Sequence, residues 1–563
     1  MRTTLALVAC AAALLSTAAA QEPVSSKEPA LASLEGMVVK DPSGEPLKKA
    51  VIELIGENQE EGGNYTATSD AEGHYKITAI QPGRYRFMVE RPGYLEAHGK
   101  DRYYMGVTLS FRAGQEVKDQ VVHMLPAAVI TGRVLDEDGD PMPNVAITVY
   151  RWKRTAGGMT FESDGHAQTD DLGEYRVRGL HTGKYYVLAS PLPSFQSLVE
   201  EHKKPDDPAV PSANLSYVPI FYPNTTERFA ASPIELHAGD DMPVDFSLVR
   251  AHTVNIRGTV EGVSSGARAV VMLRGNDPGS VFDSAEVAKD GKFEILHVSP
   301  GSYTLAAMTV LSDNTQAVHR TIEVGESNIN DLRLTPQPGA TLHGQVHFPK
   351  LLRLDSALIM LELRPRDRND EFFNSMIFSN EEGAAVRTNV TLKPDGRFEM
   401  GNVPAGLYDV YIASDARAFV DTFIESVLAG MKDVVDTGLD VSGGTMSLDI
   451  TVSNEPGVIE GAVTNDKGAA VPNVTVVAVP DPKFRKNLYR YYPTATDQSG
   501  HFTLRGIRPG EYKLLAWEGL DGDEYLDPDF LAPFEGRAAV AKVDKGTHQT
   551  VSLKVIPAPP DQP

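Results

Sequence analysis

Cysteine is almost absent from this chain of 563 residues, because the one residue of this type is Cys10. Disulfide bonds therefore cannot hold any of its domains together. A zinc site built on several thiolates is excluded as well, and so is a catalytic cysteine in the body of the chain.

Long apolar runs are also missing, since no stretch after the first residues approaches the roughly 20 apolar residues that a membrane helix needs. Residues 1–20 are typical of a cleaved signal peptide, with Arg2, an apolar stretch over 5–15 and small residues over 16–20. Cys10 resembles a lipobox cysteine, which leaves lipoprotein anchoring as an alternative. We expect a bacterial, exported protein that is periplasmic, outer-surface or secreted, with no membrane-spanning segment after cleavage.

Positive charge is scarce: 53 Lys and Arg stand against 76 Asp and Glu, for a formal net charge of −23. Nucleic-acid binding needs clustered cations, so the composition argues against such a partner. Catalytic motifs are missing too, including His-x-x-Glu, His-Glu-x-x-His, Gly-x-Ser-x-Gly and the P-loop. We therefore predict that the protein is not an enzyme and has no metal and no cofactor.

Turn-forming residues, by contrast, are abundant, with 48 Gly and 38 Pro, and they recur in a repeated unit. Its first copy reads Asp70-Ala-Glu-Gly73-His-Tyr75, followed by Pro82-Gly83-Arg-Tyr85. Five copies have both glycines ten residues apart and both aromatic residues ten residues apart. The glycine pairs are Gly73 and Gly83, Gly173 and Gly183, Gly291 and Gly301, Gly396 and Gly406, and Gly500 and Gly510.

The residue types of this unit predict two turns, each followed by a strand. An Asp can cap its own turn, and the Gly can take a positive φ. In the second turn Pro sets φ and Gly takes the left-handed position. Alternating strands at this spacing are the pattern of an antiparallel β-sandwich.

The copies are about 100 residues apart, so each is large enough to bury its own core. We predict an all-β chain of five tandem transthyretin-like, Greek-key β-sandwich domains with short helical insertions. Phe419, Phe423, Val427 and Met431 fall at a spacing of four residues, which predicts a helix in the fourth domain. The predicted segments are a signal peptide (1–20), sandwiches over 31–126, 127–250 with a long surface loop at 194–243, 251–336, 337–455 with a helical insertion at 415–439, and 456–557, and a disordered tail (558–563).

At these repeated residues the chain resembles the carboxypeptidase regulatory-like domain. The resemblance covers nearly all of residues 31–557 as five copies. It implies a transthyretin-like sandwich of about seven strands and leaves function open. Related modules accompany metallocarboxypeptidases and outer-membrane transporters and stand alone in bacterial surface proteins, and similar folds occur in starch-binding modules and in the stalk domains of adhesins.

Aromatic residues in the variable segments are the candidate binding residues, because sugars and protein partners both contact such rings. The alternative is that they pack loops onto the sandwiches. The acidic run from Asp136 to Asp140 resembles part of a calcium loop, although a solvated turn is favoured. The candidate binding residues are Tyr103, Tyr104, Tyr217, Phe221, Tyr222, Tyr489, Tyr491, Tyr492 and Trp517.

Two classes of function fit these features. The first is a non-catalytic exported protein that binds partners, with carbohydrate or cell-envelope proteins expected first, or that acts as a cell-envelope spacer. The second is an accessory subunit of a peptidase or of an outer-membrane transporter. An enzyme with an unrecognised site is the least favoured reading.

Overall fold

The computed structural model describes residues 30–56, 63–97, 106–156, 158–191, 215–276, 282–311, 314–349, 359–366, 388–414, 422–520 and 522–558. The predicted fold class is confirmed: the chain is all-β, and its strands form tandem two-sheet sandwiches. We number the five sandwiches module 1 to module 5 along the chain. The signal peptide and residues 559–563 of the tail lie outside the described residues.

Module 1 pairs a sheet of order β4-β1-β8-β6 with one of order β3-β2-β5-β7. Its strands are β1 (Ala32–Lys40), β2 (Val51–Gly56), β3 (Tyr65–Thr68), β4 (His74–Ile80), β5 (Gly83–Glu90), β6 (Tyr94–Glu96), β7 (Val107–Phe111) and β8 (Glu116–Pro126). Module 2 pairs β12-β9-β17 with β11-β10-β13-β15. Its elements are β9 (Ala128–Leu135), β10 (Val145–Thr155), β11 (Gly158–Gln168), β12 (Glu174–Leu180), β13 (Gly183–Pro191), β14 (Leu215–Tyr217), β15 (Ile220–Phe221), η1 (Arg228–Ala230), β16 (Ile234–Leu236), β17 (Asp241–Pro243), β18 (Phe246–Ser247) and β19 (Arg250–His252).

Module 3 pairs β23-β20-β26 with β22-β21-β24-β25-β27. Its strands are β20 (Val254–Val260), β21 (Arg268–Gly275), β22 (Phe282–Glu286), β23 (Lys292–Val298), β24 (Gly301–Leu311), β25 (Asn314–Val324), β26 (Ile329–Leu334) and β27 (Gln337–Pro338). Module 4 pairs β31-β28-β36-β33-β34 with β30-β29-β32-β35. Its strands are β28 (Ala340–His347), β29 (Ile359–Pro365), β30 (Asn389–Thr391), β31 (Arg397–Val403), β32 (Gly406–Ser414), β33 (Phe423–Ala429), β34 (Lys432–Asp433), β35 (Leu439–Val441) and β36 (Thr445–Ser453).

Module 5 pairs β40-β37-β43 with β39-β38-β41-β42 and carries short helices. Its strands are β37 (Gly457–Thr464), β38 (Thr475–Pro480), β39 (Tyr492–Ala495), β40 (His501–Ile507), β41 (Gly510–Trp517), β42 (Ala539–Val543) and β43 (His548–Lys554). The helices are η3 (Pro482–Phe484), η4 (Leu488–Arg490), η5 (Glu524–Leu526), α3 (Pro528–Leu531) and η6 (Ala532–Arg537).

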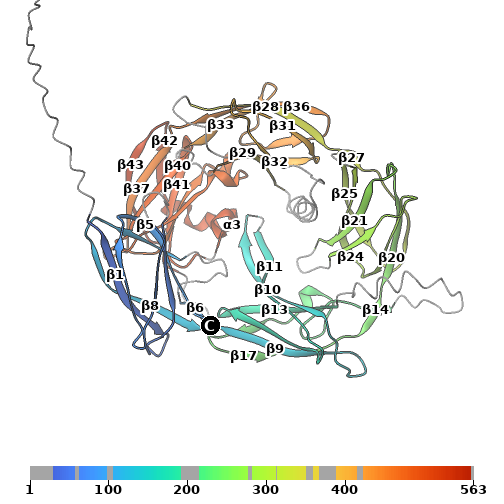
Figure 1. Ribbon diagram of the computed structural model, residues 1–563, viewed down its shortest axis with the longest axis horizontal. Coiled ribbons are helices and arrows are strands. Elements are labelled where there is room, and N and C mark those ends of the chain that lie inside the picture. Colours follow the sequence, from blue (N-terminus) through green and yellow to red (C-terminus); the bar gives the residue numbers. More distant parts are fainter. Residues whose placement is uncertain are drawn as a thin grey trace, which may run out of the picture.

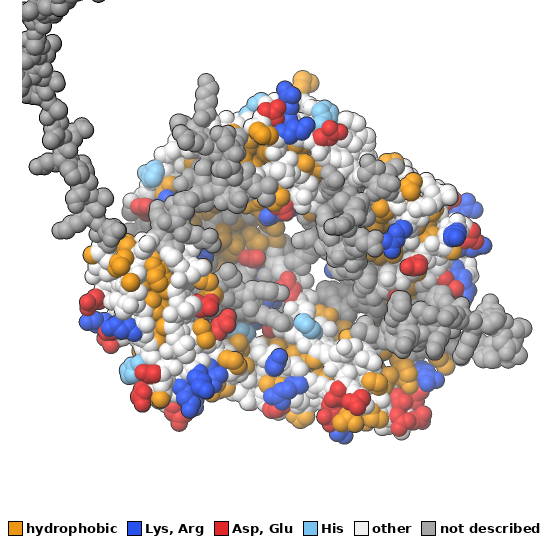
Figure 2. Space-filling model, viewed as in Figure 1, with side chains coloured by type: hydrophobic (Ala, Val, Ile, Leu, Met, Phe, Trp, Pro, Cys, Tyr) orange, Lys and Arg blue, Asp and Glu red, His pale blue; other side chains and the backbone are white. Residues whose placement is uncertain are grey.

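The five modules follow one another around a closed ring, which brings module 5 back beside module 1 (Figure 1). Modules 2, 3 and 4 turn the same sheet outward. Strands β9, β20 and β28 lie at the periphery, whereas β10, β21 and β29 lie nearer the centre (Figure 1). The face in Figure 2 is hollowed at the centre of the ring, and hydrophobic side chains lie in that hollow. One sheet of each of these modules thus presents its non-core face to the inside of the ring.

Each first strand pairs in parallel with a strand near the end of its module, as β1 does with β8, β9 with β17 and β20 with β26. The glycine inside the first strand makes this close pairing possible. A Cβ on Gly36 would lie 2.0 Å from the carbonyl oxygen of Gln120 and 2.8 Å from the hydroxyl of Tyr75. Tyr75 crosses above this glycine and donates a hydrogen bond to the same carbonyl at 3.1 Å. The repeated glycine is therefore required by packing.

The second aromatic residue of each unit is a buried tyrosine that locks the preceding turn. Its hydroxyl donates to the carbonyl oxygen four residues earlier, as in Tyr85 to Gln81 at 2.8 Å. Burial raises the pKa of Tyr85 above its usual value. The same bond recurs from Tyr185 to His181, Tyr303 to Ser299, Tyr408 to Pro404 and Tyr512 to Arg508.

The predicted helix at 415–439 is wrong over the described residues 422–439. They form β33, β34 and β35, and residues 415–421, including Phe419, lie outside the described residues. Phe423 and Val427 are both buried. A spacing of four residues also returns to the same side of a strand, so the pattern did not distinguish helix from strand. Met431, the last of the series, is fully exposed.

The predicted surface loop at 194–243 is wrong for residues 215–243, because they add strands to both sheets of module 2. Strands β15 and β16 pair with β13, and β17 pairs in parallel with β9. Strands of two or three residues are too short to produce a readable alternation. The Pro-rich composition therefore concealed them.

Candidate functional site

The candidate aromatic residues do not form one exposed surface. Phe221, Tyr491 and Trp517 are buried, against the expectation that they are available for binding. Tyr103 and Tyr104 lie outside the described residues. The other four candidates are only partly exposed and have partners within the chain; they are Tyr217, Tyr222, Tyr489 and Tyr492.

Two of these tyrosines hold the variable segment of module 2 in place. The hydroxyl of Tyr217 donates to Glu137 at 2.6 Å, and the guanidinium of Arg250 lies 5.1 Å from its ring. The ring of Tyr222 packs edge-on against Phe246 at 6.5 Å between centroids. For both residues, packing within the module is the role that their contacts support.

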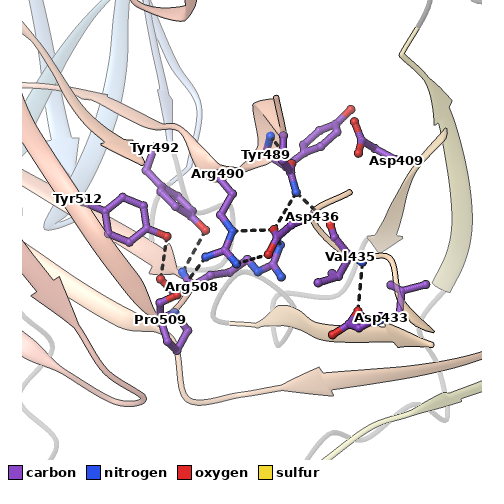
Figure 3. Close-up of polar contacts among 12 residues, drawn as sticks. Asp409, Asp433, Val435, Asp436, Tyr489, Arg490, Tyr492, Arg508, Pro509 and Tyr512 are labelled. Carbon is purple, nitrogen blue, oxygen red and sulfur yellow. Dashed lines mark hydrogen bonds and ion pairs between the residues drawn. The ribbon is translucent and has the colours of Figure 1, made fainter. Parts of the chain in front are cut away.

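Tyr489 and Tyr492 lie at the contact between modules 4 and 5, which is shown in Figure 3. Arg364 of module 4 donates to the hydroxyl of Tyr489 at 2.9 Å, and its guanidinium lies 4.1 Å from the centre of the Tyr411 ring. The hydroxyl of Tyr492 accepts the backbone N–H of Arg508 at 3.0 Å.

Asp436 is the centre of the same contact. Arg490 donates to its two carboxylate oxygens at 2.8 and 2.7 Å, and Asn487 donates to one of them at 3.2 Å. Burial alone would raise the pKa of Asp436, but the bonds from Arg490 and the charge of Arg508 outweigh it, so the pKa is lowered. These groups bind one another, and the network joins two modules.

Tyr491 and Trp517 belong to an apolar cluster on the non-core face of the sheet β39-β38-β41-β42 in module 5, which we call its inner sheet. The short helices after β41 cover this face, and the rings of Phe530 and Phe534 lie 6.0 and 5.9 Å from Trp517. Leu531 is fully buried beneath them. These aromatic residues therefore attach the helical insertion to the sandwich.

Module 2 carries a second aromatic cluster, on the face of its inner sheet opposite to the core. Trp152 and Phe161 are direct partners across β10 and β11, and Phe161 stacks on Tyr150 at 4.9 Å with an interplanar angle of 11°. The ring centroid of Tyr186, in β13, lies 5.1 Å from that of Phe161. Phe229 is the most exposed, at 83%. We call Tyr150, Trp152, Phe161, Tyr186, Phe221, Arg228 and Phe229 the aromatic platform.

Arg228 links the exposed and buried parts of the platform. Its guanidinium carbon lies 4.6 Å from the ring centre of Phe229, 5.5 Å from Trp152 and 6.0 Å from Phe161. Cation–π contacts of this kind hold a planar cation against aromatic faces. The platform thus combines partly exposed rings over a buried base of Phe161 and Phe221 with a guanidinium, a group that can donate hydrogen bonds.

Of the candidate residues, the platform includes only Phe221. The missed signal lies in β10, where Val145, Ile147 and Val149 alternate toward the core and the aromatic residues Tyr150 and Trp152 follow in the opposite phase. The pairing with β11 shifts between Val149 and Tyr150, which marks an irregularity at that point. A change of phase in an otherwise regular strand was therefore readable as a second, non-core aromatic face.

The acidic run from Asp136 to Asp140 is a turn. A carboxylate oxygen of Asp136 accepts the backbone N–H groups of Asp138 and Asp140, both at 2.9 Å. In module 5, Asp527 caps α3 and accepts a hydrogen bond from Arg154 of module 2 at 2.6 Å. Within the described residues, no three His, Cys, Asp or Glu side chains are grouped so that they could hold a metal ion.

No helix of the described residues is both long and apolar enough to cross a membrane. The family model of the carboxypeptidase regulatory-like domain matches residues 33–109, 129–215 and 458–519, in modules 1, 2 and 5. No curated protein matches the chain.

Similarities to solved structures are low. The TIE protein of Bacillus anthracis is 14% identical over 55% of this chain and 51% of its own, with a TM-score of 0.16. A streptococcal ancillary pilin is 12% identical over 54% and 99%, with a TM-score of 0.17. The minor pilin GBS52 of Streptococcus agalactiae is 13% identical over 39% and 97%, with a TM-score of 0.20. The chain spans about half the length of the TIE chain. Three of the five sandwiches, modules 1, 2 and 5, thus match the carboxypeptidase regulatory-like domain, and the chain carries such domains in tandem.

Proposed function

We propose that the protein is a non-catalytic, exported scaffold that binds glycans through the aromatic platform of module 2. The observation that carries this proposal is the platform itself. Its rings lie on the non-core face of the sheet that contains β10 and β11, and this hairpin projects toward the centre of the ring (Figure 1). Phe229 is exposed and Tyr150, Trp152 and Tyr186 are partly exposed, and aromatic groups on such a surface are typical of binding sites.

The chemistry of the platform suits a sugar. Aromatic rings offer a large, rigid apolar surface at a small cost in conformational entropy, which matches the C–H face of a pyranose. Arg228 lies beside these rings and can donate hydrogen bonds to hydroxyl or carboxylate oxygens. The closed ring also supports a scaffold role over that of an extended spacer, because an end-to-end spacer would keep modules 1 and 5 apart.

Export is the second part of the proposal, and the segment 1–20 supports it. With a signal of this kind the protein meets glycans in the periplasm, on the outer surface or in the medium. Cell-envelope proteins are the competing class of partner, and a binding assay that includes them distinguishes the two.

A panel of immobilised polysaccharides, including peptidoglycan, chitin, cellulose and starch, tests the proposal. We expect the full chain to bind at least one of them. Trp152→Ala and Phe229→Ala should each weaken that binding about tenfold, which corresponds to about 1.4 kcal/mol. Isothermal calorimetry with a soluble oligosaccharide of the retained polymer measures the change.

Met431→Ala is the matched control, because Met431 is as exposed as any large apolar residue but belongs to module 4. Its affinity should equal that of the wild type. Equal loss in all three variants, or no retention on any polymer, would contradict glycan binding at the platform. Retention of an envelope protein that depends on Trp152 would instead identify a protein-binding surface.

A further inference from the structure

Module 5 contacts modules that are far from it in the sequence, and these contacts complete the ring. Gln498 accepts the backbone N–H of Ser110 at 3.0 Å and donates to the carbonyl oxygen of Ser110 at 2.6 Å. Ser110 belongs to β7, which is an edge strand of the sheet β3-β2-β5-β7. The side-chain amide thus gives this strand edge both bonds that a neighbouring strand would give.

Gln498 stands in the repeated turn, where the modules can be compared directly. The residue one position after the turn's first residue is Ala71 in module 1, Asp171 in module 2, Lys289 in module 3 and Pro394 in module 4. None of these four side chains can both donate and accept as an amide does. The seam between modules 1 and 5 is therefore made by a residue that only module 5 has at this position.

A second contact crosses the ring from module 2 to module 5. Arg154, near the end of β10, donates to Asp527 at 2.6 Å, and the side chain of Asp527 is 5% exposed. The burial of Asp527 would raise its pKa, but the bond from Arg154 contributes to lowering it below its usual value. The pair therefore stays charged near neutral pH, and it holds η5 and α3 beside the β10–β11 hairpin.

The seam between modules 1 and 5 differs from the contact between modules 4 and 5. Modules 4 and 5 are consecutive in the sequence, and their contact contains the buried network of Asp436, Arg490 and Arg508. The seam joins chain segments 388 residues apart through the two hydrogen bonds between Gln498 and Ser110. Modules 1 and 5 are not consecutive in the sequence, so opening at this seam breaks non-covalent contacts alone.

We infer that the ring opens and closes at the seam between modules 1 and 5, with Gln498 as the latch and the Arg154–Asp527 pair as a brace. Opening leaves each sandwich intact, because each has its own core. When module 5 moves away it also breaks the Arg154–Asp527 pair, which frees the β10–β11 hairpin that carries Trp152. Closure at the seam and access to the inside of the ring are therefore one event.

Pulsed EPR distance measurement tests this inference in the full mature chain, expressed from Gln21, which has no cysteine of its own. Spin labels at Glu72→Cys of module 1 and Lys467→Cys of module 5 report the seam, since both residues are exposed. The wild type should give one narrow distribution. Gln498→Ala with Arg154→Ala should add a longer, broader component, with the open-to-closed ratio raised about 5-fold to 30-fold.

Lys289→Ala is the matched control, because it changes the same turn position in module 3, away from the seam. Its distribution should equal that of the wild type. Gln498→Glu gives a second, reversible test. At pH 7 its carboxylate cannot donate to the Ser110 carbonyl, so the ring should open, and at about pH 4 the protonated acid restores a donor and should close it.

Calorimetry first establishes that the variants retain the unfolding transitions of the wild type. With folded modules, an unchanged distribution in the double variant would overturn the inference. A broad distribution in the wild type itself would do the same, because it would mean that Gln498 does not hold the seam. Neither outcome bears on glycan binding, which Trp152→Ala tests separately.

Discussion

Modules 2 and 5 have the same sandwich but differ in what covers the non-core face of the inner sheet. In module 5 the face carries Trp517, and the chain after β41 folds back as short helices that cover it. In module 2 the corresponding face carries Trp152 and Phe161, and Phe229 remains 83% exposed. The fold therefore tolerates an aromatic inner face, and an insertion decides whether that face is interior or surface.

This contrast separates stability from binding. An aromatic residue under the helices of module 5 replaces water with protein on both sides, so its removal leaves a cavity. The exposed ring of Phe229 in the platform keeps water on one side, so its removal costs little in the folded state, whereas Phe161 and Phe221 are buried. The two modules thus provide an internal control for each other.

The largest expected effect follows from removing the anchor of module 5. Trp517→Ala should destabilise that module by about 3–5 kcal/mol, because a buried ring is lost and the helical insertion loses its contact. Its indole N–H is buried and has no hydrogen-bond partner among the described residues. Trp517→Phe should therefore cost much less, since it keeps a ring and removes an unsatisfied donor.

Calorimetric unfolding of the full chain measures both variants, with the transition of module 5 resolved from the others. Equal losses for the alanine and phenylalanine variants would show that the indole itself, and not the presence of a ring, determines the packing. The difference between modules 2 and 5 would then depend on which aromatic residue each face carries, and not on whether an insertion covers the face.

An intermediate effect is expected from the contact that fixes module 5 to module 4. Asp436→Asn leaves Arg490 and Arg508 without their carboxylate, which should destabilise the contact by about 3 kcal/mol at pH 7. The pKa of Asp436 is lowered in the folded chain, so this stabilisation is present above the unfolded pKa of about 3.9. It is lost as the pH falls through the lower, folded pKa.

The contribution of Asp436 to stability therefore has a pH dependence by which it can be recognised. The stability difference between wild type and Asp436→Asn should be constant from pH 7 to pH 5 and should shrink in more acidic solution. Unfolding transitions recorded across this range measure it. A difference that grew on acidification would mean that the carboxylate is protonated in the folded state and that the ion pairs contribute nothing.

Much of the fold could be predicted from the sequence because the residue types of the repeated turns determine where the backbone turns. Gly73 and Tyr85, and their counterparts in the other copies, must stand where the backbone turns and where a ring fills the core, so their spacing predicted the sandwiches. The parallel partner of each first strand was less visible. Its position depends on the length of the segment before it, which varies from module to module.

The candidate site was predicted poorly, for a physical reason. Tyr491 and Trp517 stand in variable segments, but composition cannot say whether such a segment turns outward or folds back over a sheet. Ring closure was equally hidden, since the partner of Gln498 lies 388 residues away. Neither the turn that contains Gln498 nor the strand that contains Ser110 carries a sign of the other.

The smallest expected effect is that of Phe229→Ala on stability. The side chain is 83% exposed, so its removal should change the unfolding free energy of module 2 by less than about 0.5 kcal/mol. Phe530→Ala, under the same assay, should cost clearly more, because Phe530 packs between Trp517 and Phe534. If Phe229 proved as costly as Phe530, it would be a structural residue of module 2, and the platform would be a second covered face, closed like that of module 5. If its loss is neutral for folding, the ring is not needed for the sandwich, as the proposal of a binding platform requires.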